Sequence, residues 1–256
     1  MKKIVFFDID GTLLDHEKNL PSKTKEALNQ LKKNGVFVAI STGRAPFMFE
    51  NLRKELDIDS YVSFNGQYVV FENEAIYKNP LNSQELERLY EHTKRNNHPL
   101  VFMTEKTMKS SVPFHPYIEE SISSLKFPHP EEDPYFYQNR DLYQTLMFCP
   151  EEEENQYTSD YSHFGFIRWH TYSVDVLPKG GSKAEGIKKM IDRLGFKLED
   201  VYAFGDGLND IEMLKAVGTG VAMGNAVPEV KQHANMTTRS VDEDGIWYGL
   251  KELELI

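Results

Sequence analysis

The first third of the chain alternates between short apolar runs and helix-forming segments. Ile4–Phe7 and Val36–Ile40 are apolar runs that stop abruptly at polar residues. Runs of this length and composition are typical of strands buried on both faces of a sheet. Pro21–Lys33 and about Pro46–Leu56 are predicted helices, and we expect Ser22 to be the N-cap of the first. This alternation predicts a parallel sheet with helices on both faces.

A β-hairpin is predicted after the second helix. Asn65-Gly66 lies between two apolar runs, Tyr61–Phe64 and Gln67–Phe71. An Asn-Gly pair between two strands favours a turn of type I′, because both central residues of that turn need positive φ. We therefore expect these two runs to pair with each other.

The composition of the sequence changes from about Asn82. Val112–Tyr143 is rich in proline and aromatic residues, and the acidic run Glu151–Glu154 is interpreted as the solvated start of a helix. We interpret this block as an inserted α/β domain with a sheet of its own. The predicted division is a core domain of residues 1–81 and 183–256 and an inserted domain of residues 82–182.

The pattern of the core resumes near Gly180. Ser182 and Glu185 have the spacing of a capping box at the start of a helix. Val201–Phe204 is another buried apolar run, and it ends in the polar segment Gly205–Asp210. The predicted fold class is therefore α/β, with a parallel core sheet and an inserted α/β domain.

Composition narrows the classes of function. The 256 residues include 40 acidic and 29 basic side chains, for a net charge of −11, which argues against binding to nucleic acid or an anionic membrane. No stretch approaches the roughly 20 apolar residues of a membrane helix. The single cysteine, Cys149, fits a reducing compartment, and we read no targeting segment. We therefore expect a cytoplasmic protein.

Asp8 and Asp10 follow the first apolar run and are two residues apart. If the chain stays extended there, both carboxylates project to the same side. At about 4 Å and an effective dielectric near 20, their repulsion would be roughly 4 kcal/mol. A divalent cation would remove that repulsion. The alternative is an ordinary Asp-Gly turn at Asp10-Gly11 after a strand.

Polar residues at three predicted strand ends suggest one ligand-binding crevice, because ligands of parallel α/β sheets bind outside the carboxyl ends of the strands. Several carboxylates together favour Mg²⁺ over zinc. Lys183, at the first position of a helix, predicts a bound phosphate, although a solvated surface lysine is the alternative. Turn formation or helix capping could also explain several of these residues singly. The residues at the strand ends are Asp8, Asp10, Thr42, Gly43, Asp206, Asn209 and Asp210.

Four segments resemble, in chain order, the four motifs of the haloacid dehalogenase superfamily. They are Asp8-Ile9-Asp10-Gly11-Thr12, Ser41-Thr42-Gly43-Arg44, Lys183, and Gly205-Asp206-Gly207-Leu208-Asn209-Asp210. The large insert between the second and third motifs is similar to that of the Cof-type sugar-phosphatase branch. The resemblance spans the whole chain and implies a Rossmann-like core with an inserted α/β cap that closes over the crevice.

The resemblance also implies a role for each motif residue. Asp8 would be the nucleophile that forms an aspartyl-phosphate, and Asp10 would be the general acid and then the base. Mg²⁺ would be held by Asp8, Asp10 (through its backbone carbonyl), Asp206 and Asp210. The phosphoryl group would be bound by Ile9, Thr42, Gly43, Lys183 and Asn209.

The expected function is hydrolysis of a small phosphorylated metabolite, such as a sugar phosphate. A phosphomutase of the same superfamily, a receiver-type signalling domain and a non-catalytic binding protein for phosphorylated metabolites are the alternatives. Arg44 and Arg168 are candidate contacts for the leaving group. The expected partner is the substrate alone, bound to a monomer or a weak homodimer.

Overall fold

The computed structural model describes residues 2–256 and divides the chain into two compact units. The core unit comprises the described residues up to Arg44, together with Met48–Tyr77 and Ser182–Ile256. The cap unit comprises Lys78–Gly181 and the short segment Ala45–Phe47. The inserted segment begins at Lys78 and ends at Gly181, whereas residues 82–182 were predicted, and Ala45–Phe47 was predicted to lie in the core.

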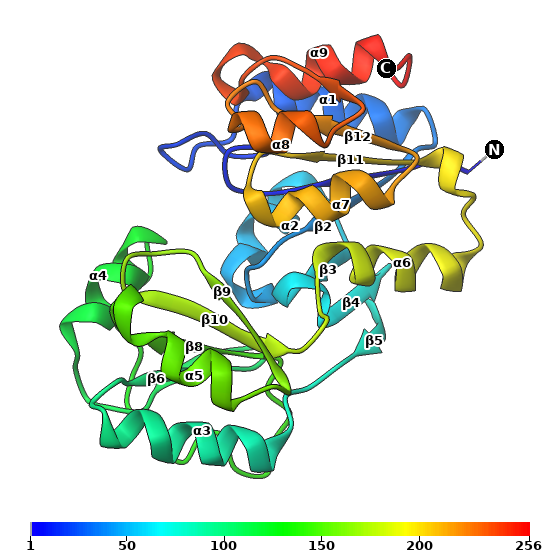
Figure 1. Ribbon diagram of the computed structural model, residues 1–256. Helices are drawn as coiled ribbons and strands as arrows, with labels where there is room; N and C mark the ends of the chain where they lie inside the picture. The colour runs from blue at the N-terminus through cyan, green and yellow to red at the C-terminus, as the bar shows by residue number, and fades with distance from the viewer. Residues whose placement is uncertain (1) are drawn as a thin grey trace. The chain divides into compact units, whose positions relative to one another are not determined.

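The core unit is built on an eight-stranded sheet in the order β13-β12-β11-β1-β2-β3-β4-β5 (Figure 1). The pairs from β13 to β3 are parallel, as the sequence pattern predicts, and β4 is antiparallel to β3. The strands are β1 (Ile4–Phe7), β2 (Phe37–Ser41), β3 (Tyr61–Ser63), β4 (Tyr68–Phe71), β5 (Glu74–Lys78), β11 (Val201–Gly205), β12 (Thr219–Ala222) and β13 (Met236–Thr237).

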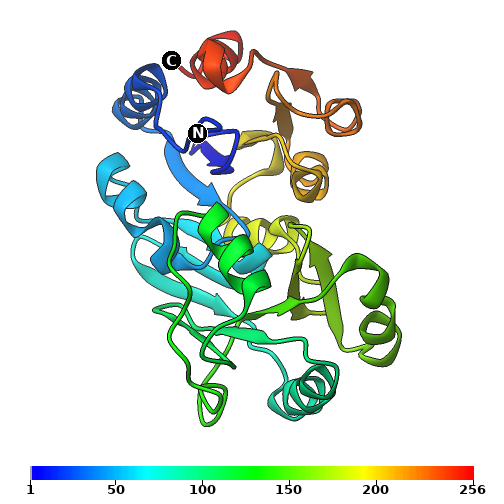
Figure 2. The same ribbon diagram turned by 90° about the vertical axis from the view of Figure 1, so that its left-hand side faces the viewer.

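Helices cover both faces of the core sheet, and α1 and α7 lie on opposite sides of β1 (Figure 2). Successive side chains of β1 point to opposite faces of the core sheet. Ile4 and Phe6 join a buried cluster with Ile187 of α6, whereas Phe7 stacks on Phe204 with ring centroids 5.2 Å apart. The core helices are α1 (Ser22–Lys33), α2 (Glu50–Leu56), α6 (Lys183–Leu194), α7 (Ile211–Ala216), α8 (Pro228–Gln232) and α9 (Gly245–Glu252).

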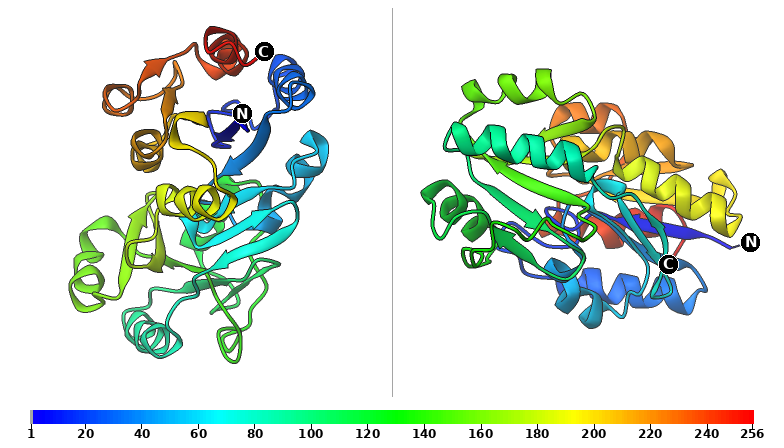
Figure 3. Two further views of the ribbon diagram at one scale, coloured as in Figure 1. Left: turned by 90° about the vertical axis from the view of Figure 1, so that its right-hand side faces the viewer. Right: turned by 90° about the horizontal axis from the view of Figure 1, so that it is seen from below.

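The cap unit has its own five-stranded sheet in the order β7-β6-β8-β10-β9 (Figure 3). All of its pairs are antiparallel, and α3 and α5 pack their buried side chains against the sheet. The strands are β6 (Leu100–Met103), β7 (Met108–Ser110), β8 (Gln144–Phe148), β9 (Phe164–Arg168) and β10 (Ser173–Pro178). The helices are α3 (Ser83–Arg95), α4 (Pro116–Ser124) and α5 (Asn155–Asp160).

The local predictions had mixed outcomes. Asn65 and Gly66 both have positive φ, 49° and 96°, so the predicted turn is confirmed. The expected N-cap of α1 is wrong, because Pro21 occupies that position and Ser22 is already helical. Proline fixes φ near −65°, which suits the start of a helix, so the N-cap lies one residue before the predicted one. Helix α4 was not predicted within the proline-rich segment, although Pro116 is its first residue.

No helix within residues 2–256 has both the length and the apolar character that crossing a membrane requires.

Candidate active site

Asp8 directly follows β1 and continues its alternation. Its N–H donates to the carbonyl of Phe204 at 3.0 Å, so the pairing of β1 with β11 extends one residue beyond the strand. Ile4 and Phe6 face α6, and Asp8 is next in the same alternation. The Asp8 residue is only 6% exposed. Strand β1 thus delivers a buried carboxylate toward the start of α6.

Lys183 is the first residue of α6 and is 1% exposed. Its Nζ lies 2.6 Å from Oδ1 of Asp8 and 2.6 Å from Oδ1 of Asp210. These carboxylates supply the negative charge that a lysine at a helix N-terminus needs. Ser182 caps the helix as predicted, because its Oγ accepts the N–H of Glu185 at 3.3 Å.

The loop after β2 and the hairpin loop both pack at the start of α6. The carbonyl of Thr42 accepts the N–H of Asn65 at 3.1 Å, and a Cβ on Gly43 would lie 3.0 Å from the Asn65 side chain. A Cβ on Gly66 would lie 2.0 Å from the carbonyl oxygen of Ser182. Only glycine permits this approach at positive φ. The predicted phosphate-binding residues Thr42 and Gly43 therefore lie beside the helix that begins with the predicted lysine.

The loop after β11 supplies two more carboxylates. Asp210 folds back, and its Oδ2 accepts the N–H groups of Asp206 at 3.0 Å and Gly207 at 2.9 Å. Oδ1 of Asp206 accepts a hydrogen bond from the Thr12 hydroxyl at 2.8 Å. Carboxylate oxygens of Asp8, Asp206 and Asp210 all lie within 4.8 Å of one another. Three of the predicted metal ligands are thus brought together.

This cluster holds more negative charge than its lysine can neutralise. Burial raises the pKa of Asp8 to about 8; the neighbouring carboxylates add to that rise, and Lys183 opposes it. Burial also raises the pKa of Asp206 to about 6. Burial alone would lower the pKa of Lys183, but Asp210 and Asp8 outweigh it and raise that pKa. Closely spaced oxygen ligands with excess negative charge fit a hard cation such as Mg²⁺.

The Asp10 side chain is held by two cations and is not part of the three-carboxylate cluster. Its oxygens accept hydrogen bonds from Arg44 Nε at 2.8 Å, Arg44 Nη2 at 2.6 Å and Lys18 Nζ at 2.6 Å. Burial would raise the pKa of Asp10, but Arg44 and Lys18 together lower it. The repulsion expected between Asp8 and Asp10 is therefore offset in part by neighbouring side chains.

The other predicted residues have different surroundings. The Ile9 side chain is fully buried, so only its backbone could contact a ligand, and Asn209 is exposed in the loop after β11. Arg168 lies in the cap unit, where it pairs with Glu154 at 2.8 Å and donates to the carbonyl of Thr171 at 2.8 Å. These contacts favour a structural role for Arg168, and its contact with substrate stays a prediction.

Sequence reasoning assigned no role to Lys18 or Asn225 and gave Thr12 no partner. Asn225 Nδ2 donates to the carbonyl of Gly11 at 2.8 Å and to Oδ2 of Asp206 at 3.3 Å. Thr12 and Asp206 are 194 positions apart, so no local pattern links them. Lys18 is only eight positions from Asp10, but it lies in an irregular loop with positive φ.

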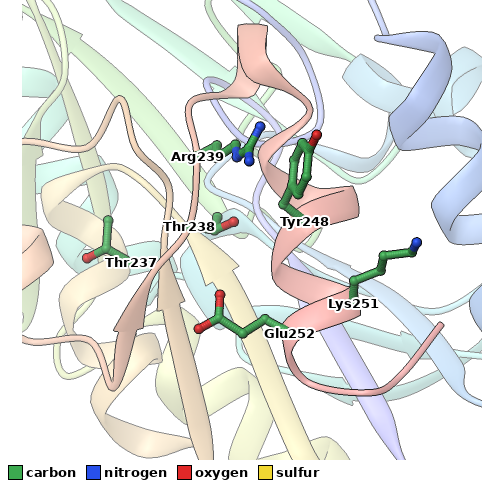
Figure 4. A pocket seen from close by; sticks show the side chains of 6 residues that line it. All are labelled: Thr237, Thr238, Arg239, Tyr248, Lys251 and Glu252. Atoms are coloured by element: carbon green, nitrogen blue, oxygen red, sulfur yellow. The ribbon is translucent and has the colours of Figure 1, made fainter.

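The core unit also has an open hollow of about 540 Å³ beside β13 and α9 (Figure 4). Arg239 stacks over the ring of Tyr248 at 3.3 Å on its wall. None of the predicted site residues lines it. Its lining residues are Thr237, Thr238, Arg239, Tyr248, Lys251 and Glu252.

Comparisons with known proteins identify the family of this chain and several of its relatives. Residues 5–250 match the family model of the haloacid dehalogenase-like hydrolases. The chain is 53% identical over 254 residues to a Bacillus subtilis (strain 168) protein named "Putative phosphatase YkrA", covering 99% of this chain and 98% of that one. A crystal structure of a hypothetical protein from Geobacillus kaustophilus HTA426 is 61% identical, with a TM-score of 0.96 and 100% of both chains covered. The HAD subclass IIB sugar phosphatase BT4131 is 33% identical, with a TM-score of 0.87 and 100% of both chains covered.

Proposed function

This chain belongs to the haloacid dehalogenase-like hydrolases, and we propose that it is a Mg²⁺-dependent phosphatase that hydrolyses a small phosphorylated metabolite. The observation that most supports this proposal is that Lys183 lies between two carboxylates. Its ammonium bridges the carboxylates of Asp8 and Asp210, beside the carboxylate of Asp206. A phosphoryl group would pair with the ammonium of Lys183, and a cation would neutralise the carboxylates that now pair with this lysine.

In the proposed reaction, an oxygen of Asp8 attacks phosphorus and forms an aspartyl-phosphate while the bond to the leaving oxygen breaks. Asp8 must be ionised to attack, and burial opposes that ionisation. Bound Mg²⁺ would favour the ionised carboxylate and offset charge on the phosphoryl group. Lys183 would then bind a phosphoryl oxygen in place of its present carboxylate partner.

Asp10 is proposed to protonate the leaving oxygen, and then to take a proton from the water that hydrolyses the aspartyl-phosphate. Its ion pairs with Arg44 and Lys18 favour the ionised form. Asp10 must therefore weaken at least one of these contacts before it can carry a proton. Arg44 is within reach of this step, which fits its predicted position near the leaving group.

The proposed ligands of Mg²⁺ are carboxylate oxygens of Asp8 and Asp206 and the backbone carbonyl of Asp10. Asp210 already accepts three hydrogen bonds, from Lys183 and two backbone N–H groups. A contact from Asp210 through water therefore fits better than a direct one. The proposed contacts to phosphoryl oxygens come from Ile9, Thr42, Gly43, Lys183 and Asn209.

The proposed substrate class is a sugar phosphate or a similarly small phosphate ester. The likeness to the sugar phosphatase BT4131 supports this class.

The test is release of phosphate from para-nitrophenyl phosphate, with Mg²⁺ and with a chelator. We expect Mg²⁺-dependent turnover that falls at least about a thousandfold in Asp8→Asn and strongly in Asp10→Asn. Asp57→Asn is the matched control, because the Asp57 side chain is 99% exposed. Full activity of Asp8→Asn would contradict the assignment of Asp8 as the nucleophile. No turnover by a folded protein that binds Mg²⁺ would favour a mutase or a binding protein.

A further inference from the structure

The carboxamide of Asn225 connects three loops of the core unit. Its Nδ2 donates to the carbonyl of Gly11 at 2.8 Å and to Oδ2 of Asp206 at 3.3 Å. Its Oδ1 accepts the N–H of Val241 at 2.9 Å. Because a carbonyl lies at one end of the amide and an N–H at the other, only one orientation satisfies all three partners. Asn225 lies in the loop after β12, and its one side chain therefore ties that loop to those after β1, β11 and β13.

Asp206 is held from both sides by neutral donors. The Thr12 hydroxyl donates to its Oδ1 at 2.8 Å, and Asn225 donates to its Oδ2. Gly11 makes room for this arrangement, since a Cβ there would lie 2.2 Å from Oδ2 of Asp206. A carboxylate offers about four acceptor positions, so two remain for a cation. A lysine in place of Asn225 would orient the carboxylate too, but its charge would compete with that cation.

We propose that Asn225 is a positioning residue for metal binding. It fixes the direction of the Asp206 carboxylate and the distance of that carboxylate from the loop that carries Asp10. This inference rests on the proposed Mg²⁺-dependent function. Residues that orient a metal ligand typically contribute 10- to 100-fold to metal affinity. We therefore expect Asn225→Ala to weaken cation binding by about tenfold.

The experiment measures the Kd of Mn²⁺, as a stand-in for Mg²⁺, by electron paramagnetic resonance on the purified full chain. Asn225→Ala is compared with Asn34→Ala, since Asn34 Nδ2 makes a similar bond, 2.9 Å from the carbonyl of Leu255. We expect about tenfold weaker binding in the first variant and unchanged binding in the second. Asn225→Ser is the replacement if the alanine variant does not fold.

A double-mutant cycle with Asp206→Asn separates positioning from general damage. If Asn225 acts mainly through Asp206, Asn225→Ala should weaken Mn²⁺ binding much less when Asp206 is already replaced. Equal losses in both backgrounds, or an unchanged Kd in the single variant, would overturn the proposal. A comparable loss in Asn34→Ala would overturn it too.

The failure of the proposed function has a different signature. If the wild-type chain does not bind Mn²⁺ or Mg²⁺, the metal-dependent reaction is wrong. The positioning role is then judged by metal-free crystal structures of the wild type and Asn225→Ala. We expect the Asp206 carboxylate to rotate away from Thr12 in the variant, and an unmoved carboxylate would overturn the inference.

Discussion

Lys183 in the core unit is buried and Arg168 in the cap unit is partly buried; both are cations paired with carboxylates, yet they are held differently. Lys183 is 1% exposed and lies between Asp8 and Asp210 at 2.6 Å from each. The Arg168 side chain is 18% exposed and pairs with Glu154. Arg168 also donates to backbone carbonyls, those of Cys149, His170 and Thr171.

The difference shows how to separate a structural cation from a functional one. Backbone carbonyls cannot change their charge or move independently of the fold, so Arg168 has partners that no ligand replaces. The partners of Lys183 are carboxylates, whose charge a metal ion or a phosphoryl group can offset. Both residues were singled out from sequence as ligand contacts. Both partners of Lys183 are carboxylates, whereas Arg168 has one carboxylate partner, Glu154, and otherwise contacts mainly backbone carbonyls.

The largest expected effect is that of Lys183→Met. It should lower activity at least about a thousandfold, since a cation directed at the phosphoryl group is lost. It should also destabilise the metal-free core by roughly 3 kcal/mol, because two buried carboxylates lose their cation. The loss of core stability is measured by urea unfolding in a Trp169→Phe background, followed through Trp247. In that background Trp247 is the only tryptophan, and it lies in the core unit.

Lys188→Met is the control for this prediction, because Lys188 is an exposed lysine of the same helix. It should change neither activity nor the urea midpoint. Activity of Lys183→Met within tenfold of wild type would show that Lys183 serves the fold alone, like Arg168.

A second, smaller effect is expected for Arg168→Lys. An ammonium cannot reproduce the forked contacts of a guanidinium, so the cap unit should lose about 1–3 kcal/mol of stability. Activity toward para-nitrophenyl phosphate should stay near the wild-type value. Unfolding is followed through Trp169 in a Trp247→Phe protein, in which it is the only tryptophan. Lost activity without lost cap stability would instead support the predicted contact with substrate.

The sequence predicted the features that depend on neighbouring residues. The run Ile4–Phe7, the Asn65-Gly66 turn and the Ser182 cap each follow from short-range rules, and the structure confirms all three. The α/β fold with an inserted domain followed from the alternation of apolar runs and helical segments, and the motifs added the resemblance to a known family. Both are confirmed by the family match and the structural neighbours.

The rest of the site depends on contacts between distant segments. The pairing of Asp10 with Arg44 and the bond from Asn225 to Asp206 cannot be read from spacing, because they depend on how separate loops end. An extended chain would have placed the Asp8 and Asp10 carboxylates on the same side, and an Asp-Gly turn at Asp10-Gly11 was the alternative. The chain instead turns at Gly11, with φ +83°, and the Asp10 side chain contacts Arg44 and Lys18.

A third effect concerns Mg²⁺ and pH. Burial raises the pKa of Asp8 to about 8 and that of Asp206 to about 6, both above the ordinary value of 3.8. Their protonated forms therefore stabilise the metal-free core below about pH 4, and this stability is lost as pH rises through 6 and 8. Mg²⁺ competes with those protons, so it should stabilise the core more at high pH.

We expect the rise in Tm on adding Mg²⁺ to be about 2–4 °C larger at pH 9 than at pH 6. It is measured through Trp247 in the Trp169→Phe protein. Asp206→Asn should reduce the response to Mg²⁺ at both pH values. A response that does not grow with pH would contradict the raised pKa values.

The smallest expected effect is the acid sensitivity of the cap unit, and its sign is opposite to that of the core. Burial lowers the pKa of His98, and Nδ1 of its ring lies 2.6 Å from the hydroxyl of Tyr157. The unfolded chain thus binds more protons than the folded cap just below pH 6.5, so cap stability should fall on acidification. His98→Asn should reduce this dependence but not abolish it, because burial also lowers the pKa of His115 in the same unit. His163→Asn should preserve the dependence, because His163 is exposed. In metal-free protein taken from pH 7 to pH 5.5, the unfolding midpoint reported by Trp169 in the Trp247→Phe protein should fall. The unfolding midpoint reported by Trp247 in the Trp169→Phe protein should rise. Midpoints that move in the same direction would show that the two units do not titrate independently.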